Sequence, residues 1–228
     1  MENEKLKFRN LTANEIECRV GTVSGTGVSL LLYKDARCDM ALLDEVCGPF
    51  GWKREHELIN GNLFCTVSIK DKDGNWVSKQ DVGVESYTEK EKGQASDAFK
   101  RACVNWGIGR ELYTAPFIWI KLKDEEWTER NGKKVPKISF EVRDIEYEGK
   151  TITYLVIVES KTKAERFKFG SPMKYKNELE EALQNVKCAQ TTDELKSIYN
   201  ELTVFQKNQD FLDALNERHA ELSKTKAA

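Results

Sequence analysis

The chain has 228 residues, of which 39% are hydrophobic and 32% are charged, and its formal net charge is −2. This length allows one domain with a substantial core and an appendage, or two small domains. Because acidic and basic residues are nearly equal in number, net charge alone cannot attract a polyanion such as a nucleic acid. A nucleic-acid site would need cations that folding gathers on one surface. No apolar run is long enough to span a membrane.

The first elements of the chain predict a β-hairpin followed by a helix. Residues 1–14 form a short lead-in. Residues 17–24 and 28–33 are rich in Val, Leu and Thr and flank Gly-Thr-Gly, which is typical of a hairpin. Apolar residues at helical spacing predict a helix over 36–47, which Gly48-Pro49-Phe50-Gly51 ends.

The next segment predicts three antiparallel strands covered by a helix. The strands are expected over 52–59, 63–70 and 76–85, and the first two are joined by Asn60-Gly61, a strong hairpin signal. One face of such a meander needs cover. Residues 94–106 carry a single apolar stripe at helical spacing, so this helix is expected to lie on the sheet.

The polar face of that helix carries two adjacent cations, Lys100 and Arg101. At 100° per residue, Asp97 and Val104 fall between them on the face opposite the apolar stripe. Periodicity alone allows two readings, a solvated helix face with one stray valine or a ligand-binding face.

The second half of the core predicts further strands. The run FIWIKLK at 117–123 reads as a short buried strand, and 124–137 reads as a polar loop. Residues 138–146 and 151–159 are expected to form another hairpin.

The fold class that we predict is therefore α+β: a β-hairpin plus helix, then a β-β-β-α core, with a C-terminal helical appendage. The core is expected over 15–160, a basic linker over 161–176, two or three helices over 177–222, and a disordered tail over 223–228.

Neither a metal nor a cofactor is expected. The six cysteines form no C-x-x-C pair, and the two histidines, His56 and His219, lie far apart. No P-loop or G-x-S-x-G elbow occurs, so we expect no catalytic residue. The N-terminal stretch MENEKLKFRN lacks the apolar core of a secretory signal, which favours a cytoplasmic protein with reduced thiols.

One enzymatic alternative stays open. Asp144, Glu159 and Lys161 spell a loose D-x14-E-x-K pattern across the second hairpin. Carboxylates that hold Mg²⁺ beside a lysine are used by metal-dependent nucleases, although a chain so rich in charge produces this pattern by chance.

The other chemical signal is a set of cations beside aromatic residues. Lysine and arginine neutralise phosphates, and aromatic or apolar side chains can contact bases. The candidates are Arg19, Tyr33, Lys34, Arg37, Lys90, Lys92, Lys100, Arg101 and Arg110.

Several short motifs of the first half stand in an order that resembles a known family. They are Glu17-Cys18-Arg19-Val20-Gly21, Tyr33-x-x-x-Arg37, Phe50-Gly51-Trp52, Lys72-Asp73-Gly74, Asp81-Val82-Gly83, and Ala95-x-x-Asp97-Ala98-Phe99-Lys100-Arg101-Ala102 closing at Trp106-Gly107. Over roughly residues 15–115 this order resembles the Rad52-type single-strand annealing family, whose phage relatives are the Sak-type annealing proteins.

The resemblance implies an ATP-independent protein that binds and anneals single-stranded DNA in recombination and repair. Subunits would assemble side by side into a ring or filament and hold the DNA backbone in a basic groove. The family positions that match Arg19, Lys100 and Arg101 contact that backbone. Arg37 matches a basic position near the hairpin, and Tyr33 also matches.

Four further residues complete the DNA-binding set that we predict. Val104 replaces an arginine of the animal proteins and is expected to touch a base, a sugar or a neighbouring subunit. Lys34, Lys90 and Lys92 are added as cations near the same elements. A phage exonuclease or a single-strand binding protein is the expected protein partner. A chain that kept this fold without binding DNA, acting as an adaptor, is the remaining alternative.

Overall fold

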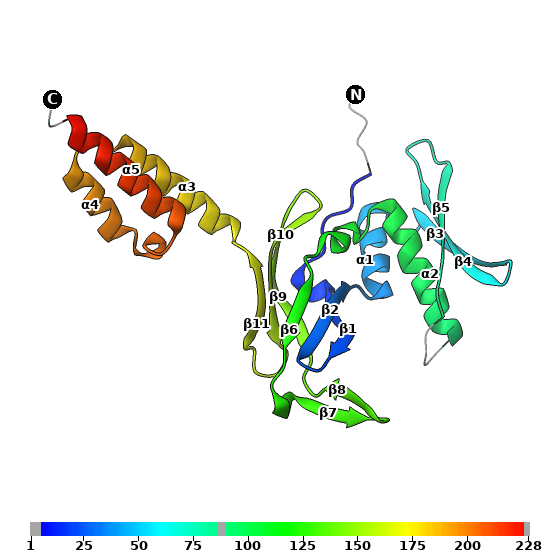
Figure 1. Ribbon diagram of the computed structural model, residues 1–228. Coiled ribbons are helices and arrows are strands. Elements are labelled where there is room, and N and C mark those ends of the chain that lie inside the picture. The colour runs from blue at the N-terminus through cyan, green and yellow to red at the C-terminus, as the bar shows by residue number, and fades with distance from the viewer. Residues whose placement is uncertain (1–5, 86–89, 226–228) are drawn as a thin grey trace. The chain divides into compact units, whose positions relative to one another are not determined.

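Figure 1 shows the computed structural model, which describes residues 6–85 and 90–225. The chain divides between Gly170 and Ser171 into two compact units. The fold is α+β, as predicted, and the strands pair antiparallel in sheets of the first unit. Among the described residues, no helix is long and apolar enough to cross a membrane.

The largest sheet has six strands in the order β11-β10-β9-β1-β2-β6. Both predicted hairpins belong to it, because β1 pairs with β9 through Glu17 and Glu141. Strand β10, the second from one edge, is a nearly continuous run of β-branched and apolar residues and is buried on both faces. The strands are β1 Glu17–Ser24, β2 Gly27–Tyr33, β6 Ile118–Lys121, β9 Phe140–Glu148, β10 Thr151–Glu159 and β11 Glu165–Gly170.

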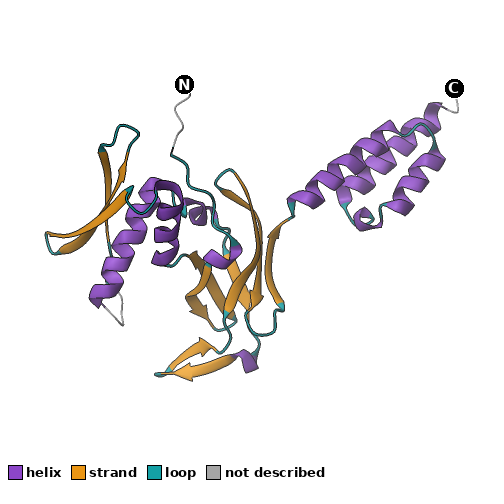
Figure 2. Ribbon diagram, turned by 180° about the vertical axis from the view of Figure 1, so that it is seen from behind, coloured by secondary structure: helices purple, strands orange, loops and turns teal. Residues whose placement is uncertain are grey.

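A second sheet has three strands in the order β3-β4-β5 and is covered on one face by helix α2, as Figure 2 shows from behind. The middle of the apolar stripe of α2 is fully buried, including Phe99 and Cys103, and the facing strand β4 buries Cys65 and Val67. The predicted β-β-β-α core is therefore confirmed. Its elements are α1 Ala36–Cys47, β3 Trp52–Ile59, β4 Asn62–Lys70, β5 Trp76–Val82 and α2 Lys90–Trp106.

The polar segment 124–137 differs from the loop that we expected. A 3₁₀ turn, η3 Asp124–Glu126, leads into a hairpin of β7 Trp127–Arg130 and β8 Lys133–Pro136. Asn131 and Gly132 both have positive φ, which is the geometry of a tight two-residue hairpin turn. The strand pattern was hidden because most of these side chains are exposed and charged, with Trp127 as the buried anchor.

The linker predicted over 161–176 is also corrected. Residues Glu165–Gly170 form β11, which pairs with β10 and so closes one edge of the large sheet. Arg166 reaches from β11 to Glu126 at 2.6 Å and to the carbonyl oxygen of Lys121 at 3.0 Å. Basic residues at an edge strand were therefore misread as a linker.

The second unit has a small helical core formed by α3 Met173–Cys188, α4 Thr192–Glu201 and α5 Gln209–Thr225, with Phe205 and Phe211 fully buried in it. The Thr191 hydroxyl caps the start of α4, because it accepts a hydrogen bond from the Glu194 N–H. The tail predicted as disordered is partly wrong, since residues 223–225 belong to α5. Residues 226–228 lie outside the described part.

Candidate nucleic-acid interface

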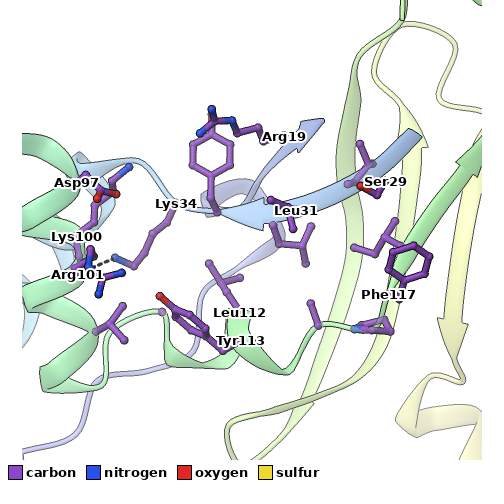
Figure 3. Close-up of a pocket in the computed structure, with 18 residues that line it drawn as sticks. Arg19, Ser29, Leu31, Lys34, Asp97, Lys100, Arg101, Leu112, Tyr113 and Phe117 are labelled. Atoms are coloured by element: carbon purple, nitrogen blue, oxygen red, sulfur yellow. Dashed lines mark hydrogen bonds between the residues drawn. The ribbon is translucent and has the colours of Figure 1, made fainter. Parts of the chain in front are cut away.

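The first unit contains an open groove of about 870 Å³, in which several of the predicted DNA-binding residues meet (Figure 3). Strand β2 forms its floor, helix α2 one wall, and the segment from the 3₁₀ turn η2 Arg110–Thr114 into β6 the other. The lining residues are Arg19, Ser29, Leu30, Leu31, Leu32, Tyr33, Lys34, Asp97, Lys100, Arg101, Val104, Gly109, Leu112, Tyr113, Ala115, Pro116, Phe117 and Ile118.

The floor is one face of the β1–β2 hairpin. Arg19 pairs in register with Leu31, so these two side chains stand side by side on that face. Gly21 lies beside them, and a Cβ there would come within 3.0 Å of the Ser29 hydroxyl and 3.3 Å of Leu31. The alternation of the hairpin thus places an arginine on the groove, and Gly21 lets Ser29 and Leu31 pack closely beside it.

The α2 wall carries Asp97, Lys100, Arg101 and Val104, which share one helix face at spacings of three, four and seven. This is the polar face that the sequence singled out, and it turns toward the groove because the opposite stripe is buried on β4 and β5. This face lies on a concave surface, and its binding of a ligand stays a prediction.

Lys100 and Tyr33 meet across the groove. The Lys100 Nζ lies 5.8 Å from the centroid of the Tyr33 ring, a cation–π distance. The Tyr33 hydroxyl donates to Glu17, and this bond raises the pKa of the phenol to about 12. Tyr33 is therefore held as a neutral phenol, with its ring beside the lysine.

Arg19, Lys100 and Arg101, which we expect to contact the DNA backbone, differ in their ion pairs within the protein. Arg101 bonds to Asp81 on β5 at 3.2 Å. Arg19 and Lys100 make no ion pair with any residue in 6–85 or 90–225, so their charges are available to a ligand. Asp97 is the single acidic residue among those lining the groove, and it accepts from the Val84 N–H at 3.0 Å.

Lys34 is placed differently from the other predicted cations. Its side chain is 4% exposed, and its ammonium donates to Asp39 and lies 3.5 Å from the Lys100 carbonyl oxygen. Burial raises the pKa of Asp39 to about 6, against the opposing effect of Lys34. A Cβ at Gly109, where φ is +68°, would collide with the Lys34 stem at 2.3 Å. Lys34 thus ties the end of β2 to α1 and α2, and its charge is used inside the protein.

The remaining predicted cations do not line the groove. The Arg37 side chain is 84% exposed and bonds to Asp35, its neighbour at the helix N-cap. Lys90 pairs with Glu85 at 3.6 Å. Lys92 stands one turn of α2 away from the groove residues and also has an interaction partner.

The wall between η2 and β6 was missed by sequence reasoning. It brings Tyr113 and Phe117 to the groove, both strongly exposed. The available signal was an aromatic pair around Ala115-Pro116, just before a buried strand. The residues before many strands show the same pattern, so the sequence did not predict that Tyr113 and Phe117 are exposed on a groove.

The nuclease pattern is not brought together. Asp144 lies opposite Val156 in the β9–β10 pairing, and Glu159 lies opposite Phe140, three residues further along β10. At about 3.3 Å per residue, the two positions are roughly 10 Å apart. Asp144 bonds to Arg143 at 2.7 Å, and within the described ranges no group of three or more potential ligands could hold a metal.

Comparisons with known proteins agree on one family. A family profile described as "Rad52/22 family double-strand break repair protein" matches residues 3–131. The chain is 36% identical over 115 residues to the single-stranded DNA-binding protein DdrA of Deinococcus radiodurans, covering 50% of this chain and 53% of that protein. It is 38% identical over 97 residues to the protein of the same name from Deinococcus deserti, covering 42% and 47%. The chain thus spans about half the length of these relatives.

Proposed function

Because this chain belongs to the Rad52/22 family of double-strand break repair proteins, we propose that it binds single-stranded DNA and anneals complementary strands in recombination and repair. The observation that carries the proposal is the meeting of Arg19 from β1 with Lys100 and Arg101 from α2 on one groove. These elements are far apart in the sequence, and each supplies a cation that the family pattern had marked.

The groove suits a nucleic-acid backbone for a physical reason. Arginine can bind a phosphate through two parallel hydrogen bonds, and lysine acts as a point charge. Contacts to phosphate position a strand without reading its sequence, which leaves the bases for pairing. The cations lower the repulsion between two polyanions, and base pairing supplies the free energy. Annealing by this route consumes no ATP and involves no catalytic residue.

The proposal also covers oligomeric assembly, cellular location and protein partners. Several copies of this chain would form a ring or filament, so that one strand passes through successive grooves. The setting would be the cytoplasm of a bacterium, with a phage or prophage origin in keeping with the Sak-type resemblance. A phage exonuclease or a single-strand binding protein would supply or protect the strand.

The first experiment measures binding and annealing by the purified full chain. A labelled oligonucleotide is titrated at several salt concentrations, two complementary oligonucleotides are annealed without ATP or metal, and the mass of the free protein is determined. We expect binding to unrelated sequences alike, faster annealing and a large oligomer.

Arg19→Ala is the diagnostic variant, and Arg143→Ala is its matched control. Arg143 is an exposed arginine on β9 that bonds to carboxylates outside the groove. Loss of one phosphate contact lowers the slope of log affinity against log salt by about one. Equal salt slopes for the two variants would contradict phosphate binding by Arg19 in the groove. A wild-type protein that binds no DNA would favour the adaptor alternative.

A further inference from the structure

Two aromatic side chains on the groove are exposed far beyond what folding requires. Tyr113 is 72% exposed and Phe117 is 79% exposed, whereas Ile118, the next residue of the strand, is fully buried. An exposed aromatic ring leaves apolar surface in water, and a single such ring is common on proteins. Two of them on one wall of a concave surface, beside the exposed Leu31 on its floor, indicate a contact that the free chain leaves unmade.

The local backbone fixes where both side chains leave the chain, and a neighbouring ring supports Phe117. Tyr113 belongs to η2, whose N-cap residue Gly109 has the left-handed conformation. Pro116 keeps Ala115 extended just before Phe117. The Phe117 ring also stacks on Trp119, with centroids 6.4 Å apart and planes inclined by 15°, so one of its faces is supported and the other is open. A held ring loses little entropy when a ligand stacks on it.

The charges of the groove identify the class of ligand. In Figure 3, Lys100 and Arg101 project from α2 on one side, and Phe117 lies on the opposite side beyond the floor strand. No cation lies over the Tyr113 or Phe117 ring within the described residues. A ligand that spans the groove therefore meets positive charge at α2, the Phe117 ring on the opposite side, and the Tyr113 ring between them. A nucleotide has this division, with a phosphate at one end and a flat base at the other.

We propose that Tyr113 and Phe117 form a base-contacting wall, on which unpaired bases of the bound strand stack while Arg19 and Lys100 hold its phosphates. The inference rests on the proposed function, since it requires a single strand in the groove. It adds a second kind of contact, which depends on the bases and is insensitive to salt.

The test compares a normal oligonucleotide with one of equal length that lacks bases. Stacking on an aromatic ring contributes about 1–3 kcal/mol per base, so Phe117→Ala and Tyr113→Ala should each weaken binding of the normal strand by about fivefold or more. Binding of the abasic strand should stay unchanged. The salt slope should also match wild type, because no phosphate contact is lost. Phe117→Tyr and Tyr113→Phe keep a ring and should restore the affinity.

Phe50→Ala is the matched control, because Phe50 is 87% exposed and does not line the groove. Variants that bind the normal strand as wild type does would overturn the base-contacting wall and leave the proposed function standing. An equal loss on the abasic strand, or a lower oligomer mass in Phe117→Ala, would also overturn it, since the wall would then contact the backbone or a second copy. A wild-type protein that binds neither strand would overturn the proposed function itself.

Discussion

The groove and the three-stranded sheet both carry cations near aromatic rings, but they pair them to different extents. On the sheet, Lys53 and Lys70 lie over the Trp76 ring at 5.3 and 5.1 Å, and Lys79 lies over Trp106 at 4.5 Å. In the groove, Lys100 lies farther from the Tyr33 ring, at 5.8 Å, and Arg101 bonds to Asp81. Arg19 has no carboxylate partner in the described chain, and no cation there lies over the Phe117 ring.

This difference separates charges that stabilise the fold from charges that can bind a ligand. A cation held over a ring or beside a carboxylate gains less from a phosphate if it must give up that partner, so Arg19 is the groove cation with most to gain. A cation and a ring that stand on opposite walls keep their capacity for a ligand with two kinds of surface. Substitutions on the sheet should therefore act on stability, and substitutions in the groove should act on DNA binding.

The largest effect is expected from Lys34, the groove residue whose charge is turned inward. Lys34→Met leaves Asp39 buried without its cation, which costs about 3–5 kcal/mol of the free energy of unfolding. Urea titration followed by tryptophan fluorescence measures it, because all five tryptophans belong to the first unit.

Lys34→Met combined with Asp39→Leu is the control for that prediction. It replaces the buried ion pair (side chains 4% and 0% exposed) by apolar groups, so most of the lost stability should return. If the single variant has the same urea midpoint of unfolding as wild type, the Lys34 charge does not stabilise the fold.

The next effect compares two double variants directly. Arg19→Ala with Lys100→Ala should weaken binding of single-stranded DNA by about 100-fold and lower the salt slope by about two, with unfolding within about 0.5 kcal/mol of wild type.

The double variant Lys53→Ala with Lys70→Ala should lower stability and leave DNA affinity nearly unchanged. We expect less than about a threefold change in affinity and a loss of roughly 1 kcal/mol in stability, from two cation–π contacts. Fluorescence anisotropy and urea titration measure the two quantities on the same preparations. Similar losses of affinity for both pairs would remove the distinction between sheet and groove.

The smallest effect concerns the ion pair between Arg166 on the large sheet and Glu126 in the 3₁₀ turn η3, neither of which lines the groove. The hydrogen bond from Arg166 lowers the pKa of Glu126 to about 2 from its usual 4.5. A carboxyl with a lowered pKa stabilises the fold above about pH 4.5, and this contribution is lost as the pH falls toward 2.

Glu126→Gln should therefore remove about 1–2 kcal/mol at pH 7 and much less near pH 3, after allowing for solvent screening. Urea titrations at the two pH values give the difference. DNA affinity at pH 7 should not change, because neither residue of this ion pair lines the groove, and a loss of affinity in this variant would show that the pair also shapes the groove.

Parts of the site were predictable because they depend on local periodicity. The stripe of α2 places Lys100 and Arg101 on its exposed face whatever lies nearby, and the Asn60-Gly61 signal predicts the hairpin that the helix covers. The motif order added Arg19 through a family resemblance. Charged strands were harder to recognise: the β7–β8 hairpin and β11 were misread, because polar side chains dominate both.

The sequence by itself determined which residues share a face of each helix and strand, the α+β class and the family. It could not distinguish Lys34, which follows β2, from Lys100, which lies within α2. Only the tertiary structure decided that one ammonium meets Asp39 in the interior and that the other faces the groove with Arg19. The physical reason is that side-chain direction follows the local backbone period, whereas the partner of a charge depends on which distant segments folding brings within a few ångströms.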